Sequence, residues 1–247
     1  MKESLNKFQI ERFSRQLILK NIGAKGQKKI LSSKILIVGV GGLGCPAAEN
    51  LVRAGIGTIG LIDNDIVNLS NIHRQSLFTS KDIKKLKVSV AAKKLKEINP
   101  STKIKIYKTK LDENNIQNII KNYEIIIDGS DNFKTKFLIN DYCIKFKKKL
   151  VTGAISKFDG HVFTFDFKDK KTACLKSFYQ DNEISDDNLN CEFMGVLGTT
   201  ASIVGTTQAN EALKMIMEIG QSLKNQILII DLLNLNFRKV KFKKNRL

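Results

Sequence analysis

Four closely spaced glycines carry the clearest chemical signal in this sequence. Gly39, Gly41 and Gly44 have the G-x-G-x-x-G spacing, and Gly42 adds a further residue without a side chain. They follow an apolar run and open a helix-like one, so that backbone N–H groups can approach a phosphate at a helix N-terminus. Asp63 comes about 20 residues later, where Rossmann-type sites place an acid on a ribose hydroxyl. These residues predict a nucleotide site, and by themselves they leave NAD and ATP equally open.

Two cationic side chains follow this acid. The loop 63–75 places Arg74 and Gln75 among small polar residues, in a chain with six arginines against 36 lysines. A guanidinium binds phosphate through two parallel hydrogen bonds, and lysine does not replace it well. Lys87 begins the next helical run on the side that faces the loop, where its charge can offset that of a second phosphate. Both residues are therefore candidate phosphate contacts.

A group of oxygen donors stands where a later apolar run ends. Asp128, Asp131 and Asn132 open the following helix. Carboxylate and amide oxygens are ligands for Mg²⁺, although the same residue types are preferred helix N-caps. The carboxyl ends of neighbouring strands border one crevice in an open α/β sheet. We therefore expect the glycine turn, Asp63, Arg74 and Asp131 to converge there.

This convergence bears on the class of reaction. Nucleotidyl transfer needs cations around the phosphates, because an anionic nucleophile is repelled by the phosphate that it attacks and the leaving pyrophosphate carries further charge. A dehydrogenase needs a hydride-transfer pocket instead. The sequence contains no G-x-x-x-x-G-K-[ST] loop, so a P-loop NTPase is not expected. The residues favour a nucleotidyltransferase, with an NAD-dependent Rossmann oxidoreductase as the alternative.

The elements that must position these residues alternate in type. Buried apolar runs and amphipathic segments follow one another, which predicts a Rossmann-like α/β fold: a mainly parallel sheet with helices on both faces. An N-terminal helical arm is expected at 8–31, with a turn near Gly23 to Gly26. Strands are expected at 34–40, 58–63, 103–107, 123–128 and 150–154, and helices at 43–55, 82–98, 113–122 and 132–147.

The pattern changes after residue 155. Apolar and polar residues then alternate as in a half-exposed sheet, and a polar stretch at 168–194 predicts a long crossover loop. We expect antiparallel strands to continue the sheet and 1–247 to form a single nucleotide-binding domain. The later strands are expected at 160–167, 226–232 and 236–242, with a long helix at 196–219.

The composition constrains partners and compartment. The net charge of +18 comes from lysines spread along the chain, which is typical of a solvated surface, so nucleic acid is not an expected partner. No apolar run is long enough to cross a bilayer, and the first residues lack the apolar core of a signal peptide. The four cysteines form no C-x-x-C pair. We expect a cytoplasmic protein without contact to a membrane.

Taken together, the motifs resemble the ThiF/MoeB/HesA adenylyltransferases, bacterial relatives of the ubiquitin-activating enzymes. The resemblance covers nearly the whole chain and keeps the motifs in order. The matching segments are Arg12-Phe-Ser-Arg-Gln-Leu, Ile37-Val-Gly-Val-Gly-Gly-Leu-Gly-Cys, Asp63 through Gln75, Lys87-Val88, Asp128-Gly-Ser-Asp-Asn and the stretch from Gly195 onwards. It implies an enzyme that uses ATP and Mg²⁺ to adenylate the C-terminal Gly-Gly carboxylate of a small ubiquitin-like sulfur carrier. Sulfur transfer then gives a thiocarboxylate for thiamine or molybdopterin synthesis.

The resemblance also implies residue roles. Arg74, Lys87 and Asp131 would be catalytic, and Asp131 would bind Mg²⁺. Arg15 would reach the ATP of the other subunit in a homodimer, and a cysteine desulfurase or rhodanese would donate sulfur. Cys191 matches a loop cysteine that forms a persulfide or acyl-disulfide link in some members, with an inert small residue as the alternative. The implied nucleotide contacts are Gly39, Gly41, Gly42, Gly44, Asp63, Asp65, Ser70, Asn71, Arg74, Gln75, Lys87, Asp131, Asn132 and, from the other subunit, Arg15.

The sequence departs from the family at a metal site. Many members hold structural zinc with two C-x-x-C pairs, whereas here the first pair is reduced to Lys171 and Cys174 and the second is absent. A tetrahedral site without three of its thiolates does not hold zinc firmly, so none is expected. Related enzymes that adenylate a tRNA base or a peptide, and a non-enzymatic scaffold, stay open as alternatives.

Overall fold

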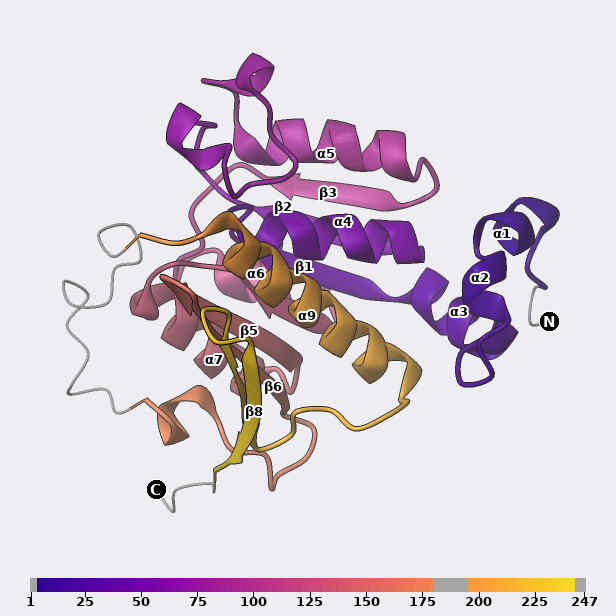
Figure 1. Ribbon diagram of the computed structural model, residues 1–247. Helices are drawn as coiled ribbons and strands as arrows, with labels where there is room; N and C mark the ends of the chain where they lie inside the picture. The colour runs from indigo at the N-terminus through magenta and orange to yellow at the C-terminus, as the bar shows by residue number, and fades with distance from the viewer. Residues whose placement is uncertain (1–3, 180–194, 243–247) are drawn as a thin grey trace.

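One eight-stranded sheet organises the protein in the computed structural model, which describes residues 4–179 and 195–242 (Figure 1). The strand order is β3-β2-β1-β4-β5-β6-β7-β8. The strands are β1 (Lys34–Val38), β2 (Thr58–Ile62), β3 (Lys103–Tyr107), β4 (Ile125–Asp128), β5 (Lys149–Ser156), β6 (Asp159–Asp166), β7 (Gln226–Asp231) and β8 (Asn236–Lys241). β1 to β5 pair in parallel, and β5 to β8 continue the sheet in antiparallel fashion. The expected mainly parallel Rossmann-like sheet with antiparallel C-terminal strands is confirmed.

Helices cover both faces of this sheet. Figure 1 shows α4 and α9 lying across it, while α1 to α3 stand at one side near the N-terminus. The helices are α1 (Lys7–Arg12), α2 (Ser14–Leu17), α3 (Gly23–Ser32), α4 (Gly44–Ala54), α5 (Lys87–Ile98), α6 (Ile116–Ile120), α7 (Phe133–Lys145) and α9 (Gly198–Met217). None of the helices in the described part of the chain is long and apolar enough to cross a membrane.

The alternation of side chains along the strands creates two cores. Ile35 and Ile37 of β1 point to the face that α4, α5 and α9 cover, whereas Leu36 and Val38 point to the face covered by α6 and α7. All four side chains are buried. A strand that is buried on both faces reads as a continuous apolar run, which explains why these strands could be predicted from sequence.

The structure corrects two of the expected elements. The helix expected at 82–98 begins only at Lys87, because the chain first forms a short 3-10 turn, Ser80–Asp82. Lys84 and Lys85 then form backbone hydrogen bonds with Val67. Lys84, two residues after this 3-10 turn, adopts a positive φ of 69°. In the N-terminal arm, the turn precedes Gly23 rather than lying near Gly23 to Gly26, and α3 starts at that glycine. The described part of the expected loop, 168–179, holds turns and a 3-10 segment, Leu175–Ser177.

Candidate functional site

The carboxyl ends of β1, β2 and β4 open into one large cleft of about 860 Å³. It contains most of the residues that the sequence analysis selected. Those lining it are Gly39, Gly41, Gly42, Asp63, Asp65, Ser70, Asn71, Arg74, Gln75, Lys87, Asp131 and Asn132. Residues far apart in sequence thus meet where a parallel sheet is expected to bind its ligand.

The glycine turn forms one wall of the cleft. Gly39 has a φ of +84°, and a Cβ there would lie 2.9 Å from the carbonyl oxygen of Gly129, so this position requires glycine. Gly41 and Gly42 line the open side. Gly44 was expected to contact the nucleotide, but it lies under the turn, where a Cβ would be 2.0 Å from the carbonyl oxygen of Gly39. Its role in the structure is close packing of the turn on α4.

Asp63 connects the glycine turn to the loop after β2. Its Oδ2 accepts a hydrogen bond from the Val40 N–H at 2.7 Å, and its Oδ1 accepts one from the Asp65 N–H at 2.8 Å. Burial raises the pKa of this carboxyl above its usual value of 3.8. Each oxygen keeps acceptor capacity toward the cleft, as a ribose contact requires.

The cations lie farther along the chain, Arg74 in this loop and Lys87 at the first position of α5. The Arg74 Nη1 donates to the Ser70 carbonyl at 2.9 Å and lies 2.7 Å from the His73 Nε2. The Lys87 Nζ lies 3.0 Å from the Asp65 Oδ2. The Lys87 side chain is 7% exposed and the Asp65 side chain 60% exposed, so a buried ammonium is paired with a carboxylate in solvent. Lys87 is already buried and Asp65 is in solvent, so pairing this ammonium with a phosphate requires little further desolvation of either side chain.

Gln75 adds an unpaired polar group to this wall. The residue is buried and lines the cleft, and its Oε1 has no hydrogen-bond partner among the described residues. A buried amide oxygen without a partner costs free energy unless a ligand or water bonds to it. This position is therefore suited to a ligand hydrogen bond.

The oxygen donors after β4 have separate roles. Asn132 caps α7, because its Oδ1 accepts from the Thr135 N–H at 2.9 Å. Asp131 is exposed in the cleft, and its Oδ1 accepts from the Asn132 Nδ2 at 3.2 Å. Asp128 was expected to contribute to a Mg²⁺ site, but it is 1% exposed and its carboxylate is bonded to Lys136, Thr152 and Ser130. It is therefore a structural residue.

The oxygen donors after β4 fit a magnesium ion that is bound together with a nucleotide. In the described ranges 4–179 and 195–242, no group of three His, Cys, Asp or Glu side chains could hold a metal ion alone. A single exposed carboxylate is nonetheless what Mg²⁺ requires when phosphates and water supply its other ligands. Asp131 meets this requirement.

The cleft lining also contains polar residues that were not predicted from the sequence, among them Lys136, His161 and Tyr179. The His161 Nδ1 lies 3.4 Å from the Tyr179 hydroxyl oxygen, and burial lowers the pKa of this histidine below 6.5. His161 occupies a polar position in an alternating strand, so its sequence context gave only a weak signal. The position of Lys136, in the first turn of the helix that follows Asp128, could have indicated a pairing between them.

Two further candidates lie away from the cleft or outside the described residues. Arg15 is exposed on α2 and does not line the cleft of its own chain. Its expected role in a second subunit stays a prediction. Cys191 lies outside the described residues. Cys174 is half-buried beside Ser177, with 3.7 Å between sulfur and hydroxyl oxygen.

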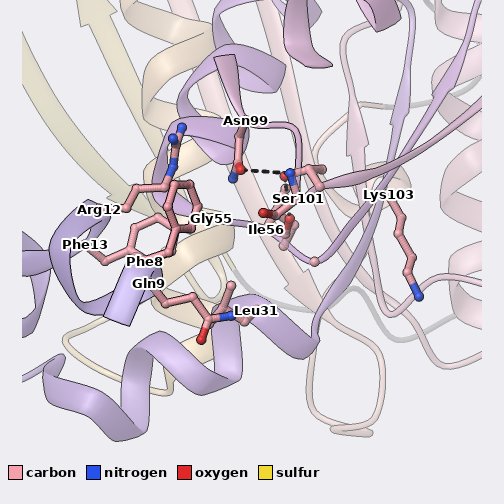
Figure 2. Close-up of a pocket in the computed structure, with 12 residues that line it drawn as sticks. Phe8, Gln9, Arg12, Phe13, Leu31, Gly55, Ile56, Asn99, Ser101 and Lys103 are labelled. Atoms are coloured by element: carbon pink, nitrogen blue, oxygen red, sulfur yellow. Dashed lines mark hydrogen bonds between the residues drawn. The ribbon is translucent and has the colours of Figure 1, made fainter. Parts of the chain in front are cut away.

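A smaller cavity of about 180 Å³ separates the arm from the end of α5 (Figure 2). Phe8 and Phe13 lie on one side of it, and the Arg12 guanidinium carbon is 6.0 Å from the centre of each ring. The Arg12 Nη2 donates to the carbonyl of Ile98, the last residue of α5. These contacts attach the arm to the core, since a cation is favourable at a helix C-terminus.

Known proteins resemble this chain along most of its length. The model of the ThiF family matches residues 13–247. The sulfur carrier protein adenylyltransferase of Thermus thermophilus is 36% identical, with 97% of this chain and 89% of that protein covered. The probable molybdopterin-synthase adenylyltransferase of Gracilaria tenuistipitata var. liui is 38% identical over 96% of this chain and 66% of its own length. The adenylyltransferase and sulfurtransferase MOCS3 of Drosophila willistoni is 39% identical over 96% of this chain and 52% of its own length. The chain thus spans about half to two thirds of the last two relatives.

Solved structures share the same architecture. A crystal structure of E. coli MccB with ATP has a TM-score of 0.85 at 21% identity, covering 98% of this chain and 74% of that one. The structure of PaaA has a TM-score of 0.82 at 21% identity, covering 99% and 77%. At this level of identity the likeness concerns the fold alone.

Proposed function

Since the chain belongs to the ThiF family, we propose that it is a nucleotidyltransferase that uses ATP to adenylate the C-terminal carboxylate of a small ubiquitin-like sulfur carrier ending in Gly-Gly. One observation supports this most strongly: the glycine turn, Asp63, Arg74, Lys87 and Asp131 line a single cleft. The names of the relatives support the choice of reaction and of substrate class.

The reaction follows from the arrangement of the cleft. In this proposal Asp63 accepts hydrogen bonds from the ribose, and the backbone at Gly41 and Gly42 contacts the phosphates. The carrier carboxylate attacks the α-phosphorus, the bond from that phosphorus to the bridging oxygen of the β-phosphate breaks, and pyrophosphate leaves with the electron pair. Arg74 and Lys87 offset the negative charge that opposes the attack and that the pyrophosphate carries away.

Asp131 would hold Mg²⁺ together with the phosphates. When bound there, the ion neutralises phosphate charge and orients the leaving group. Asp131 itself supplies a carboxylate oxygen at the edge of the cleft, and Asn132 keeps that carboxylate beside the N-terminus of α7 through its hydrogen bond.

The remaining parts of the proposal concern partners. The adenylate would receive sulfur from a cysteine desulfurase or rhodanese, giving a thiocarboxylate for molybdopterin or thiamine synthesis; the names of the relatives support the first pathway. A homodimer would bring Arg15 to the ATP of the other subunit. We further propose that 1–247 acts as one nucleotide-binding domain and that it holds no structural zinc.

An exchange assay tests the assignment of the site. We expect label from pyrophosphate to enter ATP only when a Gly-Gly-ending carrier is present, and this exchange to be lost in Arg74→Ala and Asp131→Ala. Lys134→Ala alters an exposed lysine on α7 that does not line the cleft and should retain activity. Exchange that survives in both cleft variants would contradict the assigned roles.

A further inference from the structure

We propose that Lys136 is a positioning residue for Asp131: its buried ion pair with Asp128 fixes the turn that carries the candidate magnesium ligand. The inference rests on the proposed function, because it assigns Asp131 to the Mg²⁺ that accompanies ATP. It concerns a residue that lines the cleft and that the reaction as described above does not use.

The Lys136 ammonium is held in one place by two acceptors. Its Nζ lies 3.1 Å from the Asp128 Oδ2 and donates to the Gly153 carbonyl at 2.7 Å. The side chains of Lys136 and Asp128 are 5% and 1% exposed. Burying both charges to this extent carries a desolvation penalty. Close geometry and further hydrogen bonds must offset this penalty if the pair is to be stable.

Asp128 receives further hydrogen bonds that define its surroundings. The Thr152 hydroxyl donates to the same Oδ2 as Lys136. The Gln208 side chain of α9 donates to the Asp128 backbone carbonyl at 2.8 Å. Side-chain hydrogen bonds thereby connect the end of β4 to α7, β5 and α9.

The other carboxylate oxygen of Asp128 shapes the turn itself. Its Oδ1 accepts from the Ser130 N–H at 2.9 Å and from the Ser130 hydroxyl at 2.6 Å. Asn132 caps α7 on the far side of Asp131. The exposed Asp131 is thus fixed at both ends of its short turn, by Asp128 on one side and by the helix cap on the other. Lys136 is the cation that pairs with the Asp128 carboxylate and holds it in this orientation.

Loss of Lys136 should therefore alter magnesium affinity in particular. Without its counter-ion, the buried Asp128 carboxylate is left with an unpaired charge and no longer has a fixed position, so its hydrogen bonds to Ser130 change. Residues that orient a metal ligand typically affect metal affinity by about 10-fold or more when removed. The glycine turn and Asp63 directly follow β1 and β2 rather than β4, so contacts to the nucleoside should be unaffected.

The test compares four variants by calorimetry of ATP binding at a series of Mg²⁺ concentrations, without carrier. Lys136→Met is expected to raise the half-saturating Mg²⁺ concentration about 10-fold, and Lys136→Arg to restore most of the affinity. Thr152→Val removes one donor to Asp128 and keeps the ion pair, and should raise it about threefold. The matched control is Lys134→Met, at an exposed lysine of the same helix, and it should change the value by less than about twofold.

A double-mutant cycle separates positioning from general loss of structure. In an Asp131→Asn background, Lys136→Met should add less than about twofold to the half-saturating Mg²⁺ concentration, because the ligand that it positions is already altered. Binding of adenosine in EDTA should be equal in all variants. Equal Mg²⁺ dependence of Lys136→Met and wild type, or fully additive effects in the cycle, would overturn the inference.

These readouts also separate the inference from the proposed function. The protein could adenylate no carrier and still bind ATP with a Mg²⁺ dependence that changes in Lys136→Met. That result would contradict the proposed substrate and support the positioning role. Should Lys136→Met fail to fold, Thr152→Val and Lys136→Arg carry the test, and a Thr152→Val protein with wild-type Mg²⁺ dependence would refute the inference.

Discussion

Replacement of Lys87 by methionine should remove most of the activity and leave the fold nearly unchanged. The Lys87 side chain is 7% exposed, while its partner Asp65 is 60% exposed. Removal of the lysine leaves a carboxylate that water can solvate, and methionine fills a similar volume with an unbranched chain. Because the partner carboxylate is in solvent and no buried charge is left unpaired, the free energy of unfolding should fall by about 1 kcal/mol or less.

The effect on catalysis should be much larger. A unit charge about 4 Å from a phosphate contributes about 4 kcal/mol at the effective dielectric constant of a partly buried site. Allowing for residual solvent screening, we expect a loss of about 2 to 4 kcal/mol, which corresponds to about 30- to 1,000-fold in kcat/KM for ATP. Lys110 lines the same cleft but is exposed, so Lys110→Met should cost less than about fivefold.

The assay is carrier-dependent pyrophosphate exchange, together with adenosine binding and urea unfolding of each variant. Adenosine carries no phosphate, and its affinity should be the same in wild type, Lys87→Met and Lys110→Met. Lys87 does not stabilise the phosphates if Lys87→Met exchanges pyrophosphate within about fivefold of the wild-type rate. The same conclusion follows if its exchange rate falls no more than that of Lys110→Met.

Three further predictions follow from individual residues. Gly39→Ala should lower the free energy of unfolding by about 2 to 4 kcal/mol in urea titrations, because alanine is strained at a φ of +84° and its Cβ would lie 2.9 Å from the Gly129 carbonyl oxygen; an unchanged midpoint would contradict the observed turn. The pKa of Asp63 is raised by burial, so nucleotide affinity should fall as the pH drops through a value above 3.8; Asp63→Asn should abolish this dependence in titration calorimetry. The pKa of His161 is lowered below 6.5 in the folded protein, so the unfolded chain binds more protons and the free energy of unfolding should fall as the pH drops through 6.5. The free energy of unfolding of His161→Gln should fall less than that of the wild type between about pH 7.5 and pH 5.5. An equal fall in both proteins would contradict the lowered pKa of His161.

Much of the fold could be predicted because its central strands, such as β1 and β4, are buried on both faces. The apolar runs around Ile35 and Ile125 indicate parallel strands without reference to any tertiary contact. The start of α5 could not be located in this way, since Ile83 and Leu86 continue an amphipathic pattern while the backbone pairs with Val67. Local periodicity does not report such non-local hydrogen bonds.

The candidate site could be predicted where its residues stand directly at strand ends. Gly39, Asp63 and Asp131 all follow a strand by a few residues, so the topology alone brings them together. The sequence does not show that Asp128 is a buried structural residue while Asp131 is exposed in the cleft, because the two acids differ in burial and not in type. The exclusion of Gly44 from the cleft likewise depends on a backbone contact that only the structure shows.

The central claim is that this chain attaches AMP to a carboxylate. Its most direct test is mass spectrometry of a MoaD-like or ThiS-like carrier with a Gly-Gly C-terminus, after brief incubation with the protein, ATP and Mg²⁺. We expect a carrier whose mass has increased by one adenylyl group at the C-terminal glycine, with release of pyrophosphate, and no such product with Arg74→Ala. Formation of ADP and a phosphorylated carrier, or an unmodified carrier despite tight ATP binding, would contradict it.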